Sequence, residues 1–359
     1  MRNNHNPTIR DIAQLVGVTP GTVSRALNDS PLVNQKTKKN ILKKARELDY
    51  SPNLVARRLS TGRTSAIGVV VPFFTRPSVS ERLEGVVSVL SNSHYDLVIH
   101  DIETPKQRTV GFKEILRKER FDGALIISMP ILEEDITYLR QSPVPIVFID
   151  RKHPDLSDFD SLTIDDVKGG YEATKHLIEL GHHKIGFIGD ITEVLIPPNA
   201  DTRLPKNLFK FTSSRDRYRG YQNALMEAGL PVREEYYGED QHGHHEAKEL
   251  ATRMLQLNDP PTAIFAASDS QAFGVIQAAR ALGLKVPQDL SVIGFDDIQA
   301  AEFMELTTIR QLLFESGRTG VEILLGAING DRQERANIVL PTELIIRSTT
   351  APVRKLTQE

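Results

Sequence analysis

Apolar residues in the first fifty positions recur with helical spacing in three short segments. In TIRDIAQLVG (residues 8–17), the apolar positions 9, 12, 13, 15 and 16 share one helical face, and Gly17 ends the helix. A second helix follows, with Thr19 as its N-cap and Pro20 in its first turn. A third helix, roughly Gln35 to Leu48, supplies the apolar side chains that complete a small core. The pattern predicts an all-α helix-turn-helix headpiece over residues 1–50.

From about residue 65 the pattern changes to short apolar runs that alternate with amphipathic helices. Such alternation predicts two doubly wound α/β lobes, in which ligands bind beyond the carboxyl ends of the strands, at the crevice between the lobes. The expected strands are Ala66 to Val71, Tyr95 to Asp101, Gly123 to Ser128, Ile146 to Ile149, Lys184 to Gly189, Thr262 to Ala267 and Ser291 to Phe295.

The net charge of −3 conceals a strong asymmetry along the chain. Residues 1–63 carry 12 Lys and Arg against 4 Asp and Glu, whereas the remaining 296 residues carry 32 and 43. A small positive segment joined to a large negative one indicates a head that binds a polyanion. A solvated basic tail is the alternative.

The second helix of a helix-turn-helix enters the major groove, so its outward residues face the bases. Arg25 is the best candidate for base reading, because a guanidinium can donate two hydrogen bonds to one guanine. Short polar side chains there are better suited to phosphates, and a protein-binding helix pair with a solvated Arg25 is the alternative. The expected DNA contacts of the headpiece are Thr8, Thr19, Pro20, Gly21, Thr22, Ser24, Arg25 and Asn28.

These helices and the segment after them resemble a known family. TIRDIAQLVGVTPGTVSRALN followed by YSPNLVARRLS is similar to the headpiece and hinge of the lactose-repressor (LacI/GalR) family, nearly unbroken from Thr8 to Ser60. The resemblance implies that residues 51–64 form a hinge helix in the minor groove, where Leu59 wedges open a base step and kinks the duplex. An ordinary buried leucine is the alternative for Leu59. The expected hinge contacts are Asn53, Ala56, Arg57 and Leu59.

The resemblance continues through the rest of the chain. IGVVVP, HLIELGHHKIGFIGD, SSRDRYRGY, PTAIFAASD and SVIGFDD look like the family's effector domain, which has a periplasmic-binding-protein-like (type I) fold. This implies an effector-binding and dimerisation domain over residues 65–350, followed by a tail over 351–359. The N-lobe is expected at about 65–163 and 312–340, and the C-lobe at about 164–311 and 341–350.

The resemblance also implies an effector site. Arg217 matches the family's effector arginine, whose guanidinium can hold two hydroxyls or a carboxylate, although a surface arginine is the alternative. Asp296 matches an acidic residue that accepts hydrogen bonds from the effector, with a helix cap as the alternative. At the end of AIFAA we expect Asp269 to cap the next helix. The expected effector contacts are Pro72, Phe73, Phe74, Asp150, Asp165, Arg217, Ser268, Asp296 and Gln311, with Phe73 and Phe74 either stacking on a ligand ring or lying in the core.

Two other features invite a functional interpretation. The segment 190–212 contains three prolines and is longer than the short loop that relatives commonly have, so it acts either as a lid or as an insertion without a role. His242, His244 and His245 are expected at a solvent-facing helix start and not at a metal, while His182 and His183 are expected to be structural. We expect no metal and no cofactor.

Several classes of protein are disfavoured. The chain has no cysteine, no signal-peptide core and no apolar run long enough to span a bilayer, so we expect a cytoplasmic protein that is not membrane-bound. Without a P-loop, a dinucleotide glycine fingerprint or a nucleophile elbow, we expect no enzyme.

The prediction is therefore a transcriptional regulator that binds double-stranded DNA. The tail lacks leucine heptads, so a homodimer on a near-palindromic operator is expected. The expected effector is a sugar or sugar phosphate, followed by a nucleobase or nucleoside. The alternatives are a solute-binding receptor of the same fold and a regulator controlled by a protein co-effector.

Overall fold

The computed structural model describes residues 7–27, 30–50, 63–103, 105–131, 133–151, 156–190, 212–240, 243–332 and 334–354. The chain divides into two compact units, 1–64 and 65–359. Five predicted DNA contacts, the long segment and one histidine lie outside the described residues: Asn28, Asn53, Ala56, Arg57, Leu59, residues 191–211 and His242.

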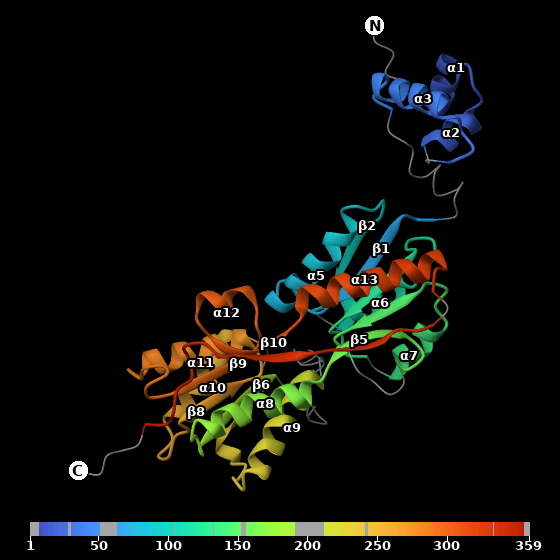
Figure 1. The fold of residues 1–359 in the computed structure, drawn as a ribbon. Coiled ribbons are helices and arrows are strands. Elements are labelled where there is room, and N and C mark those ends of the chain that lie inside the picture. The colour runs from blue at the N-terminus through green and yellow to red at the C-terminus, as the bar shows by residue number, and fades with distance from the viewer. Residues whose placement is uncertain are drawn as a thin grey trace. The chain divides into compact units, whose positions relative to one another are not determined.

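The first unit contains the three helices that the apolar spacing predicts (Figure 1). The first helix ends at Gly17 in the left-handed conformation, with φ of 71°, and the hydroxyl of Thr19 accepts a hydrogen bond from the Thr22 amide at 3.2 Å. Each helix contributes a fully buried residue to one shared core: Ile12, Val23 and Ile41. The helix-turn-helix is therefore confirmed, with α1 at Ile9–Val16, α2 at Pro20–Leu27 and α3 at Gln35–Glu47.

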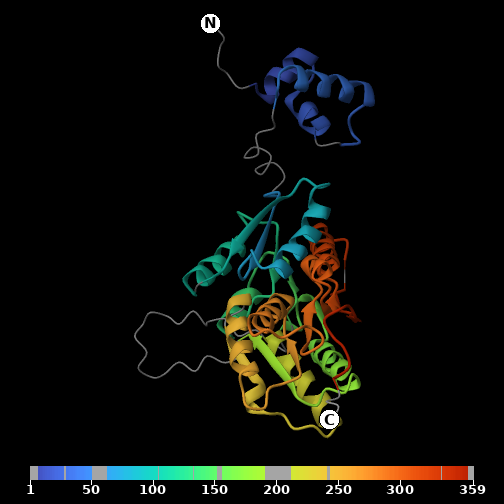
Figure 2. The same ribbon diagram turned by 90° about the vertical axis from the view of Figure 1, so that its left-hand side faces the viewer.

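The N-lobe of the second unit is a parallel sheet of six strands in the order β11-β5-β4-β3-β1-β2. Alternate residues of β1 face opposite layers: Val69 packs with α5 and α13, and Val70 packs with α6 and α7. Helices α5 and α13 lie side by side in both views (Figures 1 and 2). The strands are β1 Ala66–Val71, β2 Asp96–Asp101, β3 Gly123–Ile127, β4 Ile146–Ile149, β5 Asp160–Ile164 and β11 Asn337–Leu340, and the helices are α5 Pro77–Leu90, α6 Pro105–Ile115, α7 Glu133–Arg140 and α13 Leu313–Asn329.

The C-lobe repeats this design with strand order β12-β10-β9-β8-β6-β7, in which only β12 is antiparallel to its neighbour. Phe187 packs with α8 and α9, and the next residue, Ile188, packs with α10 and α11 on the opposite face. The strands are β6 Ile185–Asp190, β7 Tyr237–Asp240, β8 Ala263–Ala266, β9 Ser291–Asp296, β10 Thr307–Gln311 and β12 Thr342–Ile345, and the helices are α8 Asp166–Glu179, α9 Thr212–Glu227, η2 Glu234–Tyr236, α10 His244–Leu255, α11 Asp269–Ala281 and α12 Gln299–Phe303.

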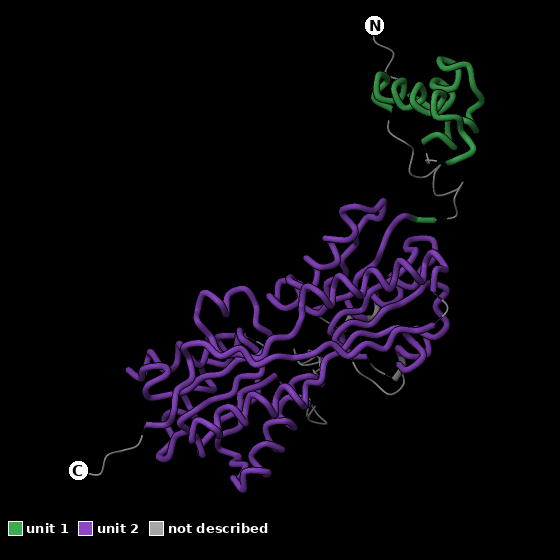
Figure 3. Tube along the Cα trace, in the orientation of Figure 1, with its two compact units in different colours: residues 1–64 green, residues 65–359 purple. Residues whose placement is uncertain are grey.

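The chain passes from one sheet to the other three times (Figure 3). The crossings follow β5 at Asp165, β10 at Leu312 and β11 at Pro341. The apolar pattern did not single out β5, β7, β10, β11 or β12, because their residues are partly exposed or polar. The two-lobed α/β fold itself is confirmed. Among the described residues, no helix is both long and apolar enough to cross a bilayer.

Two glycines bring helices close together at positions that matter for the cleft. A Cβ on Gly170 of α8 would overlap the carbonyl oxygen of Arg217 on α9, and a Cβ on Gly317 of α13 would overlap that of Arg82 on α5. Only glycine allows these backbones to approach so closely. Both pairs of helices therefore hold an arginine at a fixed position where the lobes join.

Candidate functional site

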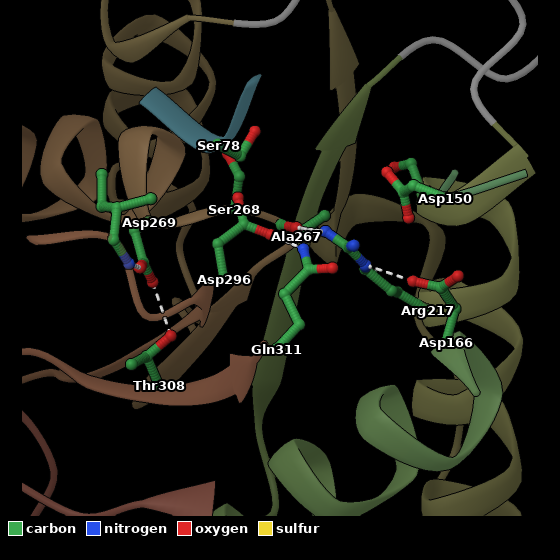
Figure 4. A network of polar contacts seen from close by, with 12 residues as sticks. Ser78, Asp150, Asp166, Arg217, Ala267, Ser268, Asp269, Asp296, Thr308 and Gln311 are labelled. Carbon is green, nitrogen blue, oxygen red and sulfur yellow. Dashed lines mark hydrogen bonds and ion pairs between the residues drawn. The ribbon is translucent and has the colours of Figure 1, made fainter. Parts of the chain in front are cut away.

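A chain of buried polar contacts joins the two lobes beside the second crossing (Figure 4). The Arg82 Nη2 donates to Gln311 Oε1 at 2.7 Å, and the Gln311 Nε2 donates to Asp296 Oδ1 at 2.6 Å. The Arg217 Nη1 lies 3.4 Å from the same Asp296 oxygen. Gln311, the last residue of β10, thus connects an N-lobe arginine with the acid and the arginine of the C-lobe.

Arg217 is buried, with only 6% of its surface exposed. Its Nε donates to Asp166 Oδ1 at 2.8 Å and its Nη1 donates to the Ala267 carbonyl at 2.6 Å. The guanidinium carbon lies 3.7 Å from the centre of the Phe295 ring, which favours a cation. The alternative of a surface arginine is therefore wrong.

The carboxylate of Asp166 has a strongly raised pKa. Burial raises the pKa of Asp166 to about 7, and nearby Asp150 and Asp216 add to the rise, although the Arg217 guanidinium opposes it. Three carboxylates thus crowd a region where desolvation already penalises negative charge.

The predicted N-lobe acid, Asp150, lies at the carboxyl end of β4. Its carboxylate accepts from the Ser128 hydroxyl at 2.7 Å and pairs with Arg82 Nη2 at 3.1 Å. Asp165 lies at the first crossing, where its carboxylate accepts from the Lys168 amide at 3.0 Å and caps α8. Both residues line a cavity of about 160 Å³.

Helix α11 is capped by Ser268 and not by Asp269, which the sequence predicted as its cap. The hydroxyl of Ser268 accepts from the Gln271 amide at 3.2 Å and caps α11. Asp269 lies inside the helix, where its carboxylate accepts from the Ile298 amide at 2.9 Å and from the Thr308 hydroxyl at 2.5 Å. The expectation that Asp269 caps this helix is wrong, because the loop from β9 and the strand β10 occupy its carboxylate.

The alternative of a helix cap does not describe Asp296 either. Helix α12 has Ile298 at its N-cap and no side-chain cap. Asp296 faces Gln311 and Arg217, whereas Asp297 turns to Arg310.

The residues that follow β1 have unequal surroundings. Pro72 is buried, and Phe73 packs partly into the N-lobe core with the Arg76 guanidinium 4.4 Å from its ring centre. Phe74 is 44% exposed, and its amide donates to Asp101 Oδ1 at 2.9 Å. Of the two aromatic rings, Phe74 is the more accessible to a ligand.

Arg82 and Asp166 are site residues that we did not single out from the sequence. Arg82 had a signal: it lies between the buried Val79 and Leu83, on the inward face of an amphipathic helix where a charge is costly. Asp166 had none, because an acid in the first turn of a helix is a common stabilising feature.

Helix α2 presents a polar face suited to DNA. Val23 and Ala26 are buried, whereas Pro20, Gly21 and Arg25 are exposed. The remaining predicted contacts have local partners: the Thr8 hydroxyl donates to Asp11 at 2.8 Å, and the Thr19 and Thr22 hydroxyls lie 3.0 Å apart, with Ser24 half-buried nearby on the helix.

His182 is buried between three partners of the C-lobe. Its Nδ1 lies 2.9 Å from the Thr262 hydroxyl, and its Nε2 lies 3.0 Å from both the Ser291 hydroxyl and the Ala351 carbonyl. Burial lowers the pKa of His182, so the neutral ring is favoured. His182 therefore has a structural role, as predicted. The described part of the chain brings together no group of three or more His, Cys, Asp or Glu fit to hold a metal.

Comparison with known proteins supports the resemblance along nearly the whole chain. The family model "Bacterial regulatory proteins, lacI family" matches residues 8–53, and "Periplasmic binding protein-like domain" matches 174–350. The transcriptional regulator DegA of Bacillus subtilis (strain 168) is 33% identical over 96% of this chain and 98% of its own. The transcriptional repressor PurR of Haemophilus influenzae (strain PittEE) is also 33% identical, over 96% and 99%.

Solved structures agree with these relatives. The Lac repressor dimer bound to operator and the anti-inducer ONPF matches with a TM-score of 0.80 and 25% identity, over 97% of this chain and 100% of that one. A complex of the transcriptional regulator CelR with cellobiose matches with a TM-score of 0.69 and 27% identity, over 96% and 99%. The chain therefore belongs to the lacI family of bacterial regulatory proteins and is a DNA-binding transcriptional regulator, not an enzyme.

Proposed function

We propose that a small molecule bound between the lobes controls the affinity of this regulator for its operator. The observation that carries the proposal is the buried chain of Arg82, Gln311, Asp296 and Arg217, which contains groups from both lobes. A ligand that contacts both ends favours one arrangement of the lobes and thereby shifts the equilibrium between two states. By linkage, operator binding then changes the affinity for that ligand by the same factor.

The proposed effector is a sugar. Buried arginine and aspartate side chains at one site offer donors and acceptors, the combination that hydroxyl groups require. Among the matching structures, one is a complex with cellobiose and another has bound ribose. The effector contacts predicted from the sequence, from Pro72 to Gln311, remain part of this proposal.

The proposed DNA interface is the exposed face of α2, with Arg25 as its base-reading residue. The hinge contacts Asn53, Ala56, Arg57 and Leu59, together with Asn28, remain predictions. A homodimer on a near-palindromic operator is proposed, because the Lac repressor match is a dimer bound to operator. We likewise propose the domain limits 1–50, 51–64 and 65–350.

The DNA arm is tested by selecting an operator from a random duplex library and measuring its binding by fluorescence anisotropy. Arg25→Ala should cost about 1–3 kcal/mol and relax preference at one base pair. Arg46→Ala removes an exposed arginine of α3 and should weaken selected and random duplexes alike. If Arg25→Ala also weakened binding to selected and random duplexes by the same factor, base reading by Arg25 would be contradicted.

The effector arm is tested by thermal shift with sugars, sugar phosphates and nucleosides, because a specific ligand raises the melting temperature. A compound that stabilises the wild type but neither Arg217→Ala nor Asp296→Ala supports the cleft as its site. A response that both variants retain would overturn this assignment, and no response to any compound would favour a protein co-effector.

A further inference from the structure

The cavity of about 160 Å³ lies where the first crossing meets the start of α9. Its walls come from both lobes, and an engineered cavity of roughly 150 Å³ is known to hold one benzene ring. The space therefore suits one six-membered or smaller ring. It is lined by Asp150, Arg151, residues 163–167, Thr212, Ser213, Asp216, Arg219 and Val339.

Arg151 supplies this cavity with an unused donor. The residue is only 8% exposed, and its Nη1 donates to the Thr212 hydroxyl at 2.6 Å. Its Nε is buried and donates to no group among the described residues. A buried guanidinium N–H without an acceptor is costly, so it is best explained by a ligand oxygen that completes the site.

Asp216, on the first turns of α9, supplies an unused acceptor. Its Oδ1 is buried and accepts no hydrogen bond within the described part of the chain. The nearest cationic nitrogens, Arg215 Nε and Arg219 Nη1, are each 3.7 Å away, beyond hydrogen-bonding distance. A hydroxyl can accept from a guanidinium and donate to a carboxylate, so hydroxyls satisfy both unused groups.

The charges of the walls argue against a phosphorylated ligand. Asp166 is paired with Arg217, and Asp150 with Arg82, so neither arginine is left to neutralise an anion. Arg151 and Arg219 line the same cavity as two further acids, Asp216 and Asp165. A phosphate monoester adds a charge of about −1.5 to −2, which these walls do not balance.

We propose that Arg151 and Asp216 form a subsite that binds hydroxyls of an uncharged, single-ring sugar and rejects its phosphate ester. This rests on the proposed function, since it names the effector class of the same cleft. It adds two specificity-determining residues that lie outside the set expected from the sequence.

The test is calorimetric titration of the full chain with D-ribose, D-glucose and D-galactose and with the corresponding sugar phosphates. At least one free sugar should bind, and its phosphate should bind at least tenfold more weakly. Arg151→Gln and Asp216→Asn should each weaken the free sugar about tenfold. Arg151→Lys keeps the charge but not the Nε donor, so it should lose affinity as well.

The matched control is Arg253→Gln, which removes an exposed arginine of α10 in the same lobe that does not line the cavity. It should bind like the wild type, and the unliganded melting temperature of each variant checks its folding. If Arg217→Ala abolishes binding while Arg151→Gln and Asp216→Asn match the control, the cleft stands and the subsite is refuted. A phosphate that binds as well as its sugar, or a panel in which no free sugar binds, also overturns the proposal.

Discussion

Replacing Gln311 by alanine removes the only amide in the chain of contacts that joins the lobes. Its two hydrogen bonds, to Arg82 at 2.7 Å and to Asp296 at 2.6 Å, both involve charged groups. Both partners are buried in the wild type, Arg82 at 2% and Asp296 at 6% exposure. Each therefore loses a partner in a place where water cannot easily replace it.

The magnitude follows from these two bonds. A hydrogen bond to a charged group contributes about 1.5–3 kcal/mol, and loss of both is partly offset because Arg82 keeps Asp150 and Asp296 keeps Arg217. We expect a loss of about 3 kcal/mol in the free energy of unfolding. For a large unit this corresponds to a decrease of roughly 6 °C in melting temperature.

The assay is differential scanning calorimetry of the full chain, following the transition of residues 65–359. Gln288→Ala is the matched control, because it removes an exposed glutamine of the same unit and should change stability by less than about 0.5 kcal/mol. If Gln311→Ala has the same melting temperature as the control, the contacts of Gln311 do not stabilise the junction between the lobes. The inferred connection between the lobes through Gln311 is then refuted.

Two further predictions concern the headpiece and the acid beside Arg217. Gly17→Ala should destabilise the headpiece by about 1 kcal/mol in a denaturant titration, because φ of 71° is strained for alanine. No atom lies within 4 Å of the added Cβ, so the expected loss comes from the backbone alone. Unchanged stability would contradict the left-handed conformation at the end of this helix. Burial raises the pKa of Asp166 from 3.8 to about 7, so the folded state binds this proton more tightly and the free energy of unfolding should fall as pH rises from about 4 to about 7. Asp166→Asn should remove this part of the pH profile of the melting temperature, and an identical profile in the variant would refute the shifted pKa.

Local spacing carries most of the predictable information in this sequence. Runs such as Ala66 to Val71 and Ser291 to Phe295 became strands because every residue in them is buried, which produces a continuous apolar signal. The headpiece was equally readable, since Gly17, Thr19 and Pro20 mark the helix ends by their backbone and capping chemistry. Edge strands such as β11 were not predicted, because alternate residues in them are exposed and give no continuous apolar signal.

The cleft could be predicted only in part. Arg217 and Asp296 stood out through their motifs, yet no local pattern indicates that Gln311 meets a residue 229 positions away. Ser268 and Asp269 show the same limit: either could cap α11, and the choice depends on Ile298 and Thr308, which arrive from other elements. Side-chain partners across the lobes are set by the fold and not by sequence neighbours.

The arrangement of these contacts explains how a ligand could act on the lobes as a whole. A second contact between the lobes involves the residue before Arg82: the backbone amide of Gln299 on α12 donates to the Glu81 carboxylate on α5 at 2.7 Å. Helix α5 therefore contacts the C-lobe through two consecutive residues, Glu81 and Arg82. A rotation of one lobe against the other must therefore lengthen at least one of these contacts. A ligand held by Arg217 and Asp296 on one side and Asp150 on the other gains or loses contacts in the same rotation. Its free energy of binding then differs between the two arrangements, which is the condition for any shift in operator affinity.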